Sequence, residues 1–486
     1  RPMLSAGRPG ADPLRPAQRS PGELDVWLDL LDPASQASLR RLLQAPLLRD
    51  RSFGSQLLDS WAGGQLLDEV GDLLTTADGR STTAMLQATL RQQLLQRRQV
   101  TLLSLLRGLP EQRLNLRLDS LVALAEQWRQ QIHQQRLALL ALQQLDLPRI
   151  PGRTPYLGDL PAAPQLLLLP VAHRRQPLPL DLWPARAPEA SHHPWLLVLP
   201  GLGGNADQLG WFAAAMAQWG WSVAVIQHPG SDGPALKAAL EGRGSTPGAS
   251  SLPERLQDVA AVLEAQRRGQ LALPGKGVVL VGHSLGGLTA LLAAGLRPAP
   301  GLVGRCREAI DRLPVANPSR LLQCELANAG VPAPFPRNRD LRAVVLFNGF
   351  GSLLWPQWAG STRPLQLPVL MTGGSLDLVT PPLEEQLQLF LPPGDPRSRL
   401  VLVEGGSHFS PVRMEAKEEA VLRLGQDLVG ADPVAVQNLL LGISGAFLQS
   451  LESSSLLPAQ ERSQQGVRAY VLDGPLARRW HELLLR

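Results

Sequence analysis

One serine lies between glycines at a point where an apolar stretch of the sequence changes its pattern. Residues 278–295 read VVLVGHSLGGLTALLAAG, a β-branched run followed by a run rich in alanine and leucine. This change predicts a buried strand over residues 277–281, then a tight turn, then a helix. Gly282 and Gly286 lack the side chains that would collide in such a turn. The hydroxyl of Ser284 is therefore expected at the carboxyl end of the strand, exposed as a nucleophile.

Ser284 requires a base, because a serine hydroxyl is a weak nucleophile until a neighbouring group accepts its proton. His408, in the segment EGGSHFSP, follows the last predicted strand and is the histidine that we assign to this role. His228, in QHPGSDG, also follows a predicted strand and is the alternative. His283 is next to Ser284 in the sequence, but the turn should direct its ring away from the hydroxyl.

A carboxylate must in turn fix the tautomer of the base and stabilise the imidazolium cation. Asp377, in GGSLDLVTPP, follows the preceding predicted strand and lies in a segment rich in turn-forming residues. We therefore assign Asp377 to this role, with Asp232 and Asp340 as the alternatives.

Two backbone amides are candidates for binding the oxyanion of a tetrahedral intermediate. Leu285 directly follows the nucleophile, and Leu202 lies in PGLGGNADQ, the glycine-rich segment after the strand predicted at residues 195–199. That segment lacks the lysine of a phosphate-binding loop and the GxGxxG spacing, which argues against nucleotide binding. Cys306 and Cys324 lack a CxxC spacing and an accompanying histidine cluster, so we expect no metal site.

The elements that would position these residues alternate along the chain after about residue 166. Short strand-like runs alternate with helical segments, and several runs are apolar on both faces, as in parallel strands covered by helices on two sides. The fold class is therefore α/β, with a mostly parallel sheet flanked by helices. The leucine- and glutamine-rich region before it has apolar residues three and four apart, which predicts an N-terminal all-α domain.

The predicted domain organisation has five parts. They are a flexible tail over residues 1–19, a helical accessory domain over 20–147, a Pro/Gly-rich linker over 148–165, an α/β catalytic domain over 166–431 with a cap insertion at 297–340, and a C-terminal helical extension over 432–486.

Composition excludes several classes of partner. A hydrophobic fraction of 44% and a charged fraction of 18% are typical of a globular protein. No uninterrupted apolar stretch reaches the ~18 residues of a spanning helix, so we expect no membrane span. The net charge is +5, but lysine occurs only at Lys237, Lys276 and Lys417, and no basic run is interleaved with aromatic residues. We therefore expect no nucleic-acid partner.

Two features of the accessory regions leave alternatives open. The cysteines lie 18 positions apart within the insertion. They would form a disulfide in an exported protein and would be buried thiols in a cytosolic one. The sequence begins at Arg1 rather than at a methionine, as expected after removal of an export signal, so we favour export. The N-terminal leucine stripe is either the core of a bundle or a surface for peripheral membrane contact.

The cap insertion offers apolar residues near the predicted site. Leu321, Leu322, Phe335, Trp355 and Trp358 form either a wall for an acyl chain or only the core of the cap itself.

Residues 165–430 resemble the α/β-hydrolase superfamily. The segments VLPGLGGN, IQHPGSDG, VGHSLGG, GGSLDLVTPP and EGGSHFSP are similar to those of bacterial relatives of the platelet-activating-factor acetylhydrolase group, often described as predicted dienelactone hydrolases. The helical region before the linker is similar to an uncharacterised domain that accompanies such hydrolases. True dienelactone hydrolases use a cysteine nucleophile, whereas this chain has Ser284.

The resemblance implies an α/β-hydrolase fold and hydrolysis of a small-molecule or lipid carboxylic ester through an acyl-enzyme on Ser284, without a cofactor. The order Ser284, Asp377, His408 is the order that this fold uses, and the family pattern places an oxyanion amide at Leu202. Two alternatives stand beside this hypothesis. One is an acyltransferase with the same three residues, and the other is a non-catalytic α/β-hydrolase scaffold.

Overall fold

The computed structural model divides into two compact units. It describes residues 46–48, 61–96, 100–110, 114–152, 163–185, 192–240, 243, 247–310, 317–336, 338–356, 365–413, 431–453 and 455–485. The predicted tail over residues 1–19 and Trp358 lie outside these ranges. One unit comprises Arg1–Arg129 and Ala235–Thr246, and the other comprises Gln130–Pro234 and Pro247–Arg486.

The first unit is mainly helical, as predicted, but it also contains short strands. Its elements are α4 (Trp61–Leu73), α5 (Thr83–Gln96), α6 (Leu102–Gly108), the start of α7 (Leu118–Gln143), and the strand pairs β1 (Pro46–Leu48) with β3 (Val100–Thr101) and β2 (Leu74–Thr76) with β4 (Leu114–Leu116). Leu86, Leu90, Leu105 and Leu109 are buried together in its core. The described leucines of α5 and α6 thus support the bundle-core interpretation.

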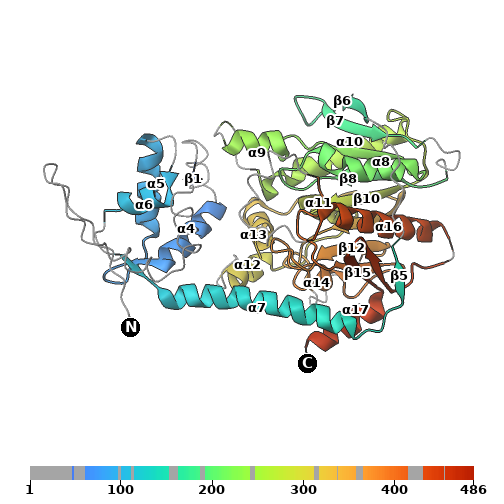
Figure 1. Ribbon diagram of the computed structural model, residues 1–486. Helices are drawn as coiled ribbons and strands as arrows, with labels where there is room; N and C mark the ends of the chain where they lie inside the picture. The colour runs from blue at the N-terminus through green and yellow to red at the C-terminus, as the bar shows by residue number, and fades with distance from the viewer. Residues whose placement is uncertain are drawn as a thin grey trace. The chain divides into compact units, whose positions relative to one another are not determined.

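The second unit is built on an eleven-stranded sheet with the order β5-β14-β15-β13-β12-β11-β10-β8-β9-β7-β6 (Figure 1). The strands are β5 (Arg149–Pro151), β6 (Gln165–Leu169), β7 (Leu178–Trp183), β8 (Trp195–Leu199), β9 (Val223–Ile226), β10 (Val278–His283), β11 (Leu341–Phe347), β12 (Val369–Gly374), β13 (Arg399–Val403), β14 (Gln460–Gln464) and β15 (Val467–Leu472). The neighbours from β9 to β13 all pair in parallel, which confirms the predicted fold class.

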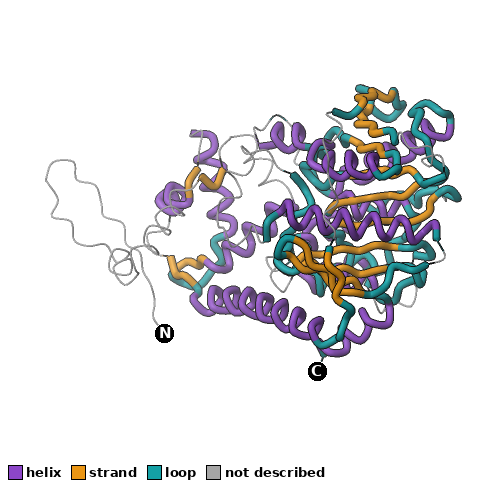
Figure 2. The backbone as a smooth tube through the Cα atoms, turned by 45° about the vertical axis from the view of Figure 1, so that its right-hand side comes forward, coloured by secondary structure: helices purple, strands orange, loops and turns teal. Residues whose placement is uncertain are grey.

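Helices lie on both sides of this sheet (Figure 2). They are α8 (Gly210–Gln218), α10 (Leu252–Arg267), α11 (Leu285–Ala293), α14 (Gln386–Phe390), α16 (Pro433–Glu452) and α17 (Gly474–Leu484). Helix α9 (Gly233–Leu240) lies mostly in the segment that belongs to the first unit. One large apolar cluster joins α8 and α16 to alternate residues of the central strands, such as Val279 and Val281 of β10. Every residue of β10 is buried, so the opposite face of this strand is covered too.

The C-terminal region differs from the predicted helical extension. Two of its segments, β14 and β15, form a hairpin that continues the sheet beyond β13. Gln465 and Gly466 form the two-residue turn, and both have positive φ angles, of 50° and 81°. Such angles are typical of a hairpin turn whose twist matches the strands. The predicted boundary at residue 431 therefore does not separate two domains. Likewise, part of the predicted linker is strand β5, which pairs with β14.

Helix α16 meets the length and hydropathy of a membrane span, alone among the described residues. In the structure, however, 72% of its apolar window is buried inside the protein. Its residues Ile443 and Phe447 belong to the large core cluster, so α16 functions as a core helix of the α/β unit.

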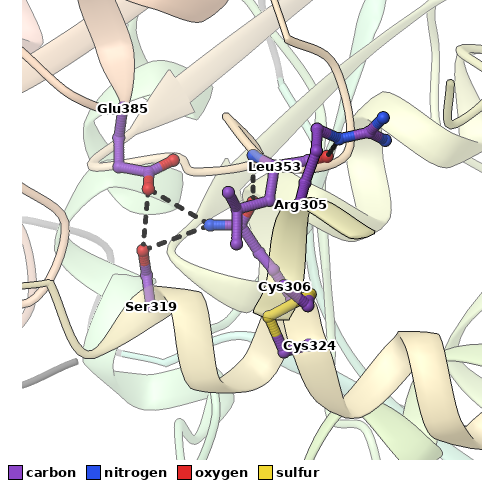
Figure 3. Close-up of a disulfide and its surroundings, with 7 residues drawn as sticks. Arg305, Cys306, Ser319, Cys324, Leu353 and Glu385 are labelled. Atoms are coloured by element: carbon purple, nitrogen blue, oxygen red, sulfur yellow. Dashed lines mark hydrogen bonds between the residues drawn. A yellow bond between two sulfur atoms is a disulfide. The ribbon is translucent and has the colours of Figure 1, made fainter. Parts of the chain in front are cut away.

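The predicted cap insertion contains α12 (Leu302–Ile310) and α13 (Ser319–Ala329). Cys306 of α12 and Cys324 of α13 form a disulfide (Figure 3). The structure thus selects the disulfide over the two buried thiols.

A buried carboxylate, that of Glu385, connects the cap to the sheet edge. Its Oε1 accepts hydrogen bonds from Gln323 Nε2 at 3.1 Å and Ser319 Oγ at 3.1 Å, both in α13 (Figure 3). Its Oε2 accepts from the backbone amides of Gly351 and Ser352, each at 2.9 Å, in the loop after β11. A carboxylate can satisfy all these donors at once, because it is acceptor-only when ionised.

We expect Glu385→Gln to lower the free energy of unfolding by roughly 2–4 kcal/mol, because the amide directs a donor at groups that are themselves donors. Glu384→Gln is the matched control. Glu384 is the neighbouring, half-buried carboxylate that pairs with Arg320 at 2.8 Å, and its loss should cost less than about 1 kcal/mol. Urea denaturation of both variants measures the difference. Equal losses would mean that Glu385 does not anchor the cap.

Candidate active site

Ser284 lies in a sharp turn between β10 and α11. Its φ is 52° and its ψ −119°, a left-handed backbone conformation that serine rarely adopts. A Cβ at Gly282 would overlap the backbone of Gly286, and a Cβ at Gly286 would overlap the carbonyl group of Leu199. Glycine is therefore required at both positions, as the sequence predicts, and this close approach is what holds the serine at the sheet edge.

Ser284, His408 and Asp377 are brought together at the carboxyl ends of β10, β13 and β12. His408 Nε2 lies 3.0 Å from Ser284 Oγ, and His408 Nδ1 lies 2.9 Å from Asp377 Oδ2. All three side chains are buried, with Asp377 wholly inaccessible to solvent. With the Nδ1 proton donated to Asp377, Nε2 is free to accept the serine proton.

The carboxylate of Asp377 receives more hydrogen bonds than the one from His408. Thr380 Oγ1 donates to Oδ2 at 2.6 Å, and the Thr380 backbone amide donates to Oδ1 at 2.7 Å. Asn348 Nδ2 also donates to Oδ2, at 2.6 Å. Burial by itself would raise the pKa of Asp377, but the charge of His408 and the hydrogen bonds from His408 and Thr380 outweigh it. The pKa of Asp377 is therefore lowered, and the carboxyl group stays ionised.

Asn348 is a site residue that the sequence reasoning missed. It directly follows β11, and its φ of 51° is positive, like that of Ser284 at the end of the neighbouring strand. Its amide also donates to the carbonyl oxygen of Ser407 at 3.1 Å, so it orients both Asp377 and the loop of His408. A polar residue before glycine at a strand end, as in FNG, was the available signal.

His283 supports the base from the other side. Its Nε2 donates to the carbonyl oxygen of His408 at 2.9 Å, and its ring centroid lies 5.0 Å from that of His408. Nε2 of His283 is thus engaged by the backbone of His408, and among the described residues no hydrogen bond joins His283 to the serine hydroxyl. Burial first, and the charge of His408 second, lower the pKa of His283 from 6.5 to about 3.

The loop after β8 runs directly against the serine. A Cβ added at Gly201 would lie 3.3 Å from Ser284 Cβ and 3.0 Å from His283 Nδ1. Leu202 follows in this loop, and Leu285 is the first residue of α11. In the described part of the chain, neither amide donates a hydrogen bond to another protein group. Among the described residues, both amides therefore lack a protein acceptor.

The alternative residues are engaged elsewhere. His228 is buried and hydrogen-bonds through Nδ1 to Asp258 at 2.8 Å. Asp232 accepts a hydrogen bond from Gln227 Nε2 at 2.9 Å. The carbonyl group of Asp340 accepts a hydrogen bond from the backbone amide of Val278, at the amino end of β10. Ser284 follows the carboxyl end of the same strand. The structure therefore brings His408 and Asp377 to Ser284 rather than these alternatives.

An apolar hollow of about 80 Å³ lies beside α11 and β12. Its lining includes Leu291, Met371, Phe390 and the cap-side residue Trp355, but Ser284 and His408 are not among the lining residues. Trp355 is buried and donates from Nε1 to the carbonyl oxygen of Arg297, so it packs within the fold. Within the described ranges, no group of three or more His, Cys, Asp or Glu residues is arranged to hold a metal ion.

The lowered pKa of His283 predicts a pH-dependent stability. The unfolded histidine binds a proton below pH 6.5, whereas the folded one does so only near pH 3, so acidification favours unfolding across that window. We expect the free energy of unfolding to fall by roughly 2 kcal/mol between pH 7 and pH 5 from this residue alone.

Urea denaturation at both pH values measures this loss. His283→Gln should remove that part of the pH dependence, whereas His133→Gln, at an exposed position, should leave it as in the original chain. An unchanged dependence in His283→Gln would contradict the assignment.

Two family profiles match parts of the chain. The profile described as "Alpha/beta hydrolase family" matches residues 196–424, which contain β8 to β13 and the site. The profile described as "Alpha/beta hydrolase of unknown function (DUF1400)" matches residues 17–117, in the helical unit. No curated protein matches the chain.

Several solved structures are similar to part of the chain. One is esterase 2 of Thermogutta terrifontis phosphoramylated by tabun, with 14% identity, a TM-score of 0.36, and coverage of 61% of this chain and 97% of that chain. Another is an acylaminoacyl peptidase of Pyrococcus horikoshii, with 11% identity, a TM-score of 0.35, and coverage of 60% of this chain and 41% of that chain.

The parallel order of the central strands, the serine turn after β10 and the profile match over residues 196–424 agree with one another. The second unit thus has the α/β-hydrolase fold, and residues 196–424 match the profile of the α/β-hydrolase family.

Proposed function

We propose that this chain is a serine hydrolase that cleaves carboxylic esters through an acyl-enzyme on Ser284. The observation that carries the proposal is the continuous hydrogen-bond chain from Ser284 Oγ to His408 at 3.0 Å and from His408 to Asp377 at 2.9 Å. The motif resemblance to the platelet-activating-factor acetylhydrolase group supports an ester as the bond that is cleaved.

In the acylation half-reaction, Ser284 Oγ attacks the ester carbonyl carbon while His408 Nε2 accepts the hydroxyl proton. The carbonyl oxygen becomes an oxyanion, which the amides of Leu285 and Leu202 stabilise. The carbon–oxygen bond to the alcohol then breaks. His408 returns its proton to the leaving alkoxide, and an acyl group remains on Ser284.

The deacylation half-reaction repeats these roles with water. His408 Nε2 removes a proton from water, whose oxygen attacks the acyl carbon, and the oxyanion forms again between the two amides. Collapse releases the carboxylic acid, and the proton returns from His408 to Ser284 Oγ. Asp377 remains ionised throughout, because its hydrogen bonds hold its pKa below the ordinary value.

A fluorophosphonate probe tests the nucleophile directly. The purified protein should be labelled at Ser284, located by mass spectrometry, and should hydrolyse short-chain nitrophenyl esters. Ser284→Ala should lose both properties while keeping its thermal stability.

Two outcomes would change the proposal. A folded protein that is neither labelled nor active would favour the non-catalytic scaffold. Ester products formed only when an alcohol acceptor is present would favour the acyltransferase.

The hydrogen bond from His408 Nδ1 to Asp377 fixes the tautomer of the histidine, so Asp377→Asn should change it. An asparagine amide can donate to His408 Nδ1 and so favours the tautomer whose Nε2 cannot accept the serine proton. We expect kcat for ester hydrolysis to fall by about 10⁴-fold. Asp340→Asn is the control, because Asp340 lies by the opposite end of β10, and its kcat should be unchanged. A loss confined to Asp340→Asn would overturn the assignment of Asp377.

A further inference from the structure

A second buried network lies behind the loop that carries Leu202. Its centre is Arg255 of α10, whose side chain is 1% exposed. The guanidinium donates from Nη2 to the carbonyl oxygen of Pro200, from Nη1 to Ser231 Oγ at 2.8 Å, and from Nε to Thr289 Oγ1 at 3.1 Å. These three partners belong to the loop after β8, the loop after β9, and α11. Arg255 therefore joins three separate elements next to the site.

The contacts of Arg255 fix the loop on both sides of Leu202. Pro200 precedes the Gly201–Leu202 pair and is held directly. Gly203 follows, and its amide donates to the carbonyl oxygen of Ser231 at 2.8 Å, while Arg255 binds the hydroxyl of the same serine. The backbone around Leu202 is thus fixed from both ends.

The third contact of Arg255 connects it, through Thr289, to Leu285, the other residue whose amide is a candidate for binding the oxyanion. Thr289 Oγ1 accepts from Arg255 and donates to the carbonyl oxygen of Leu285 at 2.8 Å. Leu285 directly follows Ser284 in the chain. One guanidinium is thereby linked to the neighbours of Leu202 on both sides and, through Thr289, to the backbone of Leu285.

This arrangement has an energetic cost. Burial lowers the pKa of Arg255 from 12.5 to about 9, although the charge of Asp258 partly compensates. Asp258 itself is wholly buried and is bound by Arg174, His173 and His228. An apolar residue at position 255 would avoid the cost of desolvating a charge. Stability alone therefore does not account for a buried arginine at this position.

We propose that Arg255 is a positioning residue that holds the amides of Leu202 and Leu285 in the geometry needed to bind the oxyanion. The inference rests on the proposed function. This positioning role requires the planar, forked guanidinium group of arginine, because a lysine ammonium cannot donate to three divergent acceptors at once.

The test compares an ester with its thionoester, in which sulfur replaces the carbonyl oxygen. Sulfur accepts hydrogen bonds weakly, so turnover of the thionoester depends little on the amides. For Arg255→Met we expect kcat on the ester to fall by about 10²-fold, the scale of losing one oxyanion donor, with KM little changed. On the thionoester the fall should be much smaller. Arg255→Lys should show the same pattern, because it retains the charge and loses the fork.

Two further variants separate positioning from stability. Arg399→Met is the matched control, because Arg399 is also a buried arginine that binds backbone carbonyl groups, those of Leu457, Pro396 and Ser398, at the amino end of β13. It should lose stability and keep the preference for the ester over the thionoester. Ser231→Ala removes only one contact of Arg255 and should lower that preference several-fold in a stable protein.

The outcomes are distinguishable. A selective loss on the ester in the Arg255 variants and Ser231→Ala supports the inference. Parallel losses on both substrates, or no loss on either, overturn it while leaving the ester hydrolase intact. If Arg255→Met does not fold, Arg255→Lys and Ser231→Ala decide the question in the same way. An original chain that is not labelled at Ser284 and hydrolyses neither substrate overturns the proposed function and this inference with it.

Discussion

The left-handed backbone at Ser284 is the constraint on which the site depends. A non-glycine residue with positive φ is strained by about 1–3 kcal/mol and persists only where its surroundings fix it. Here the Ser284 amide donates to the carbonyl oxygen of Phe347 in the adjacent strand at 3.0 Å. Asn348, one strand further, also has a positive φ, and its backbone amide donates to the carbonyl oxygen of Thr372 at 2.9 Å. Parallel pairing of β10, β11 and β12 therefore supports two strained residues side by side.

The same sheet explains why the site tolerates buried polar groups. Each functional side chain leaves the end of a different strand, and each finds hydrogen-bond partners in the loop of a neighbour. Asp377 is bound by Asn348 from the loop after β11, and the loop of His408 by His283 from the end of β10. Glu385 and Arg255 have similar roles. The carboxylate of Glu385 accepts hydrogen bonds from α13 and the loop after β11, and the guanidinium of Arg255 donates to two loops and to α11. Polar burial on this scale requires nearly complete satisfaction of its hydrogen bonds.

The sequence predicts the parts of this architecture that depend on local pattern. The alternation of strand and helix, and glycines flanking Ser284, are sufficient to predict the parallel sheet and the serine turn. Asp377 and His408 could be assigned because an acid and a histidine, each in the loop after a predicted strand, suggest a chemistry together with Ser284. Asn348 also follows a strand, but an amide there suggests no role until its partner Asp377, 29 positions away, is known. Arg255 lies within a helix, and its role arises from contacts with other elements, such as Thr289, 34 positions away. The hairpin of β14 and β15 was missed because its first strand, QERSQ, is a polar segment without strand-like apolar alternation.

The addition of β14 and β15 to the sheet has a consequence for how the chain can be divided. Helix α16 fills the same core as α8, and β15 covers the open side of β13. Helix α17 follows β15 and packs near β13, and Trp480 Nε1 donates to the carbonyl oxygen of Ala138 in α7. The segment matched by the hydrolase profile is thus not self-contained, since residues both before and after it complete its core. A gene fusion or domain transfer would therefore have to include the residues on both sides of this segment.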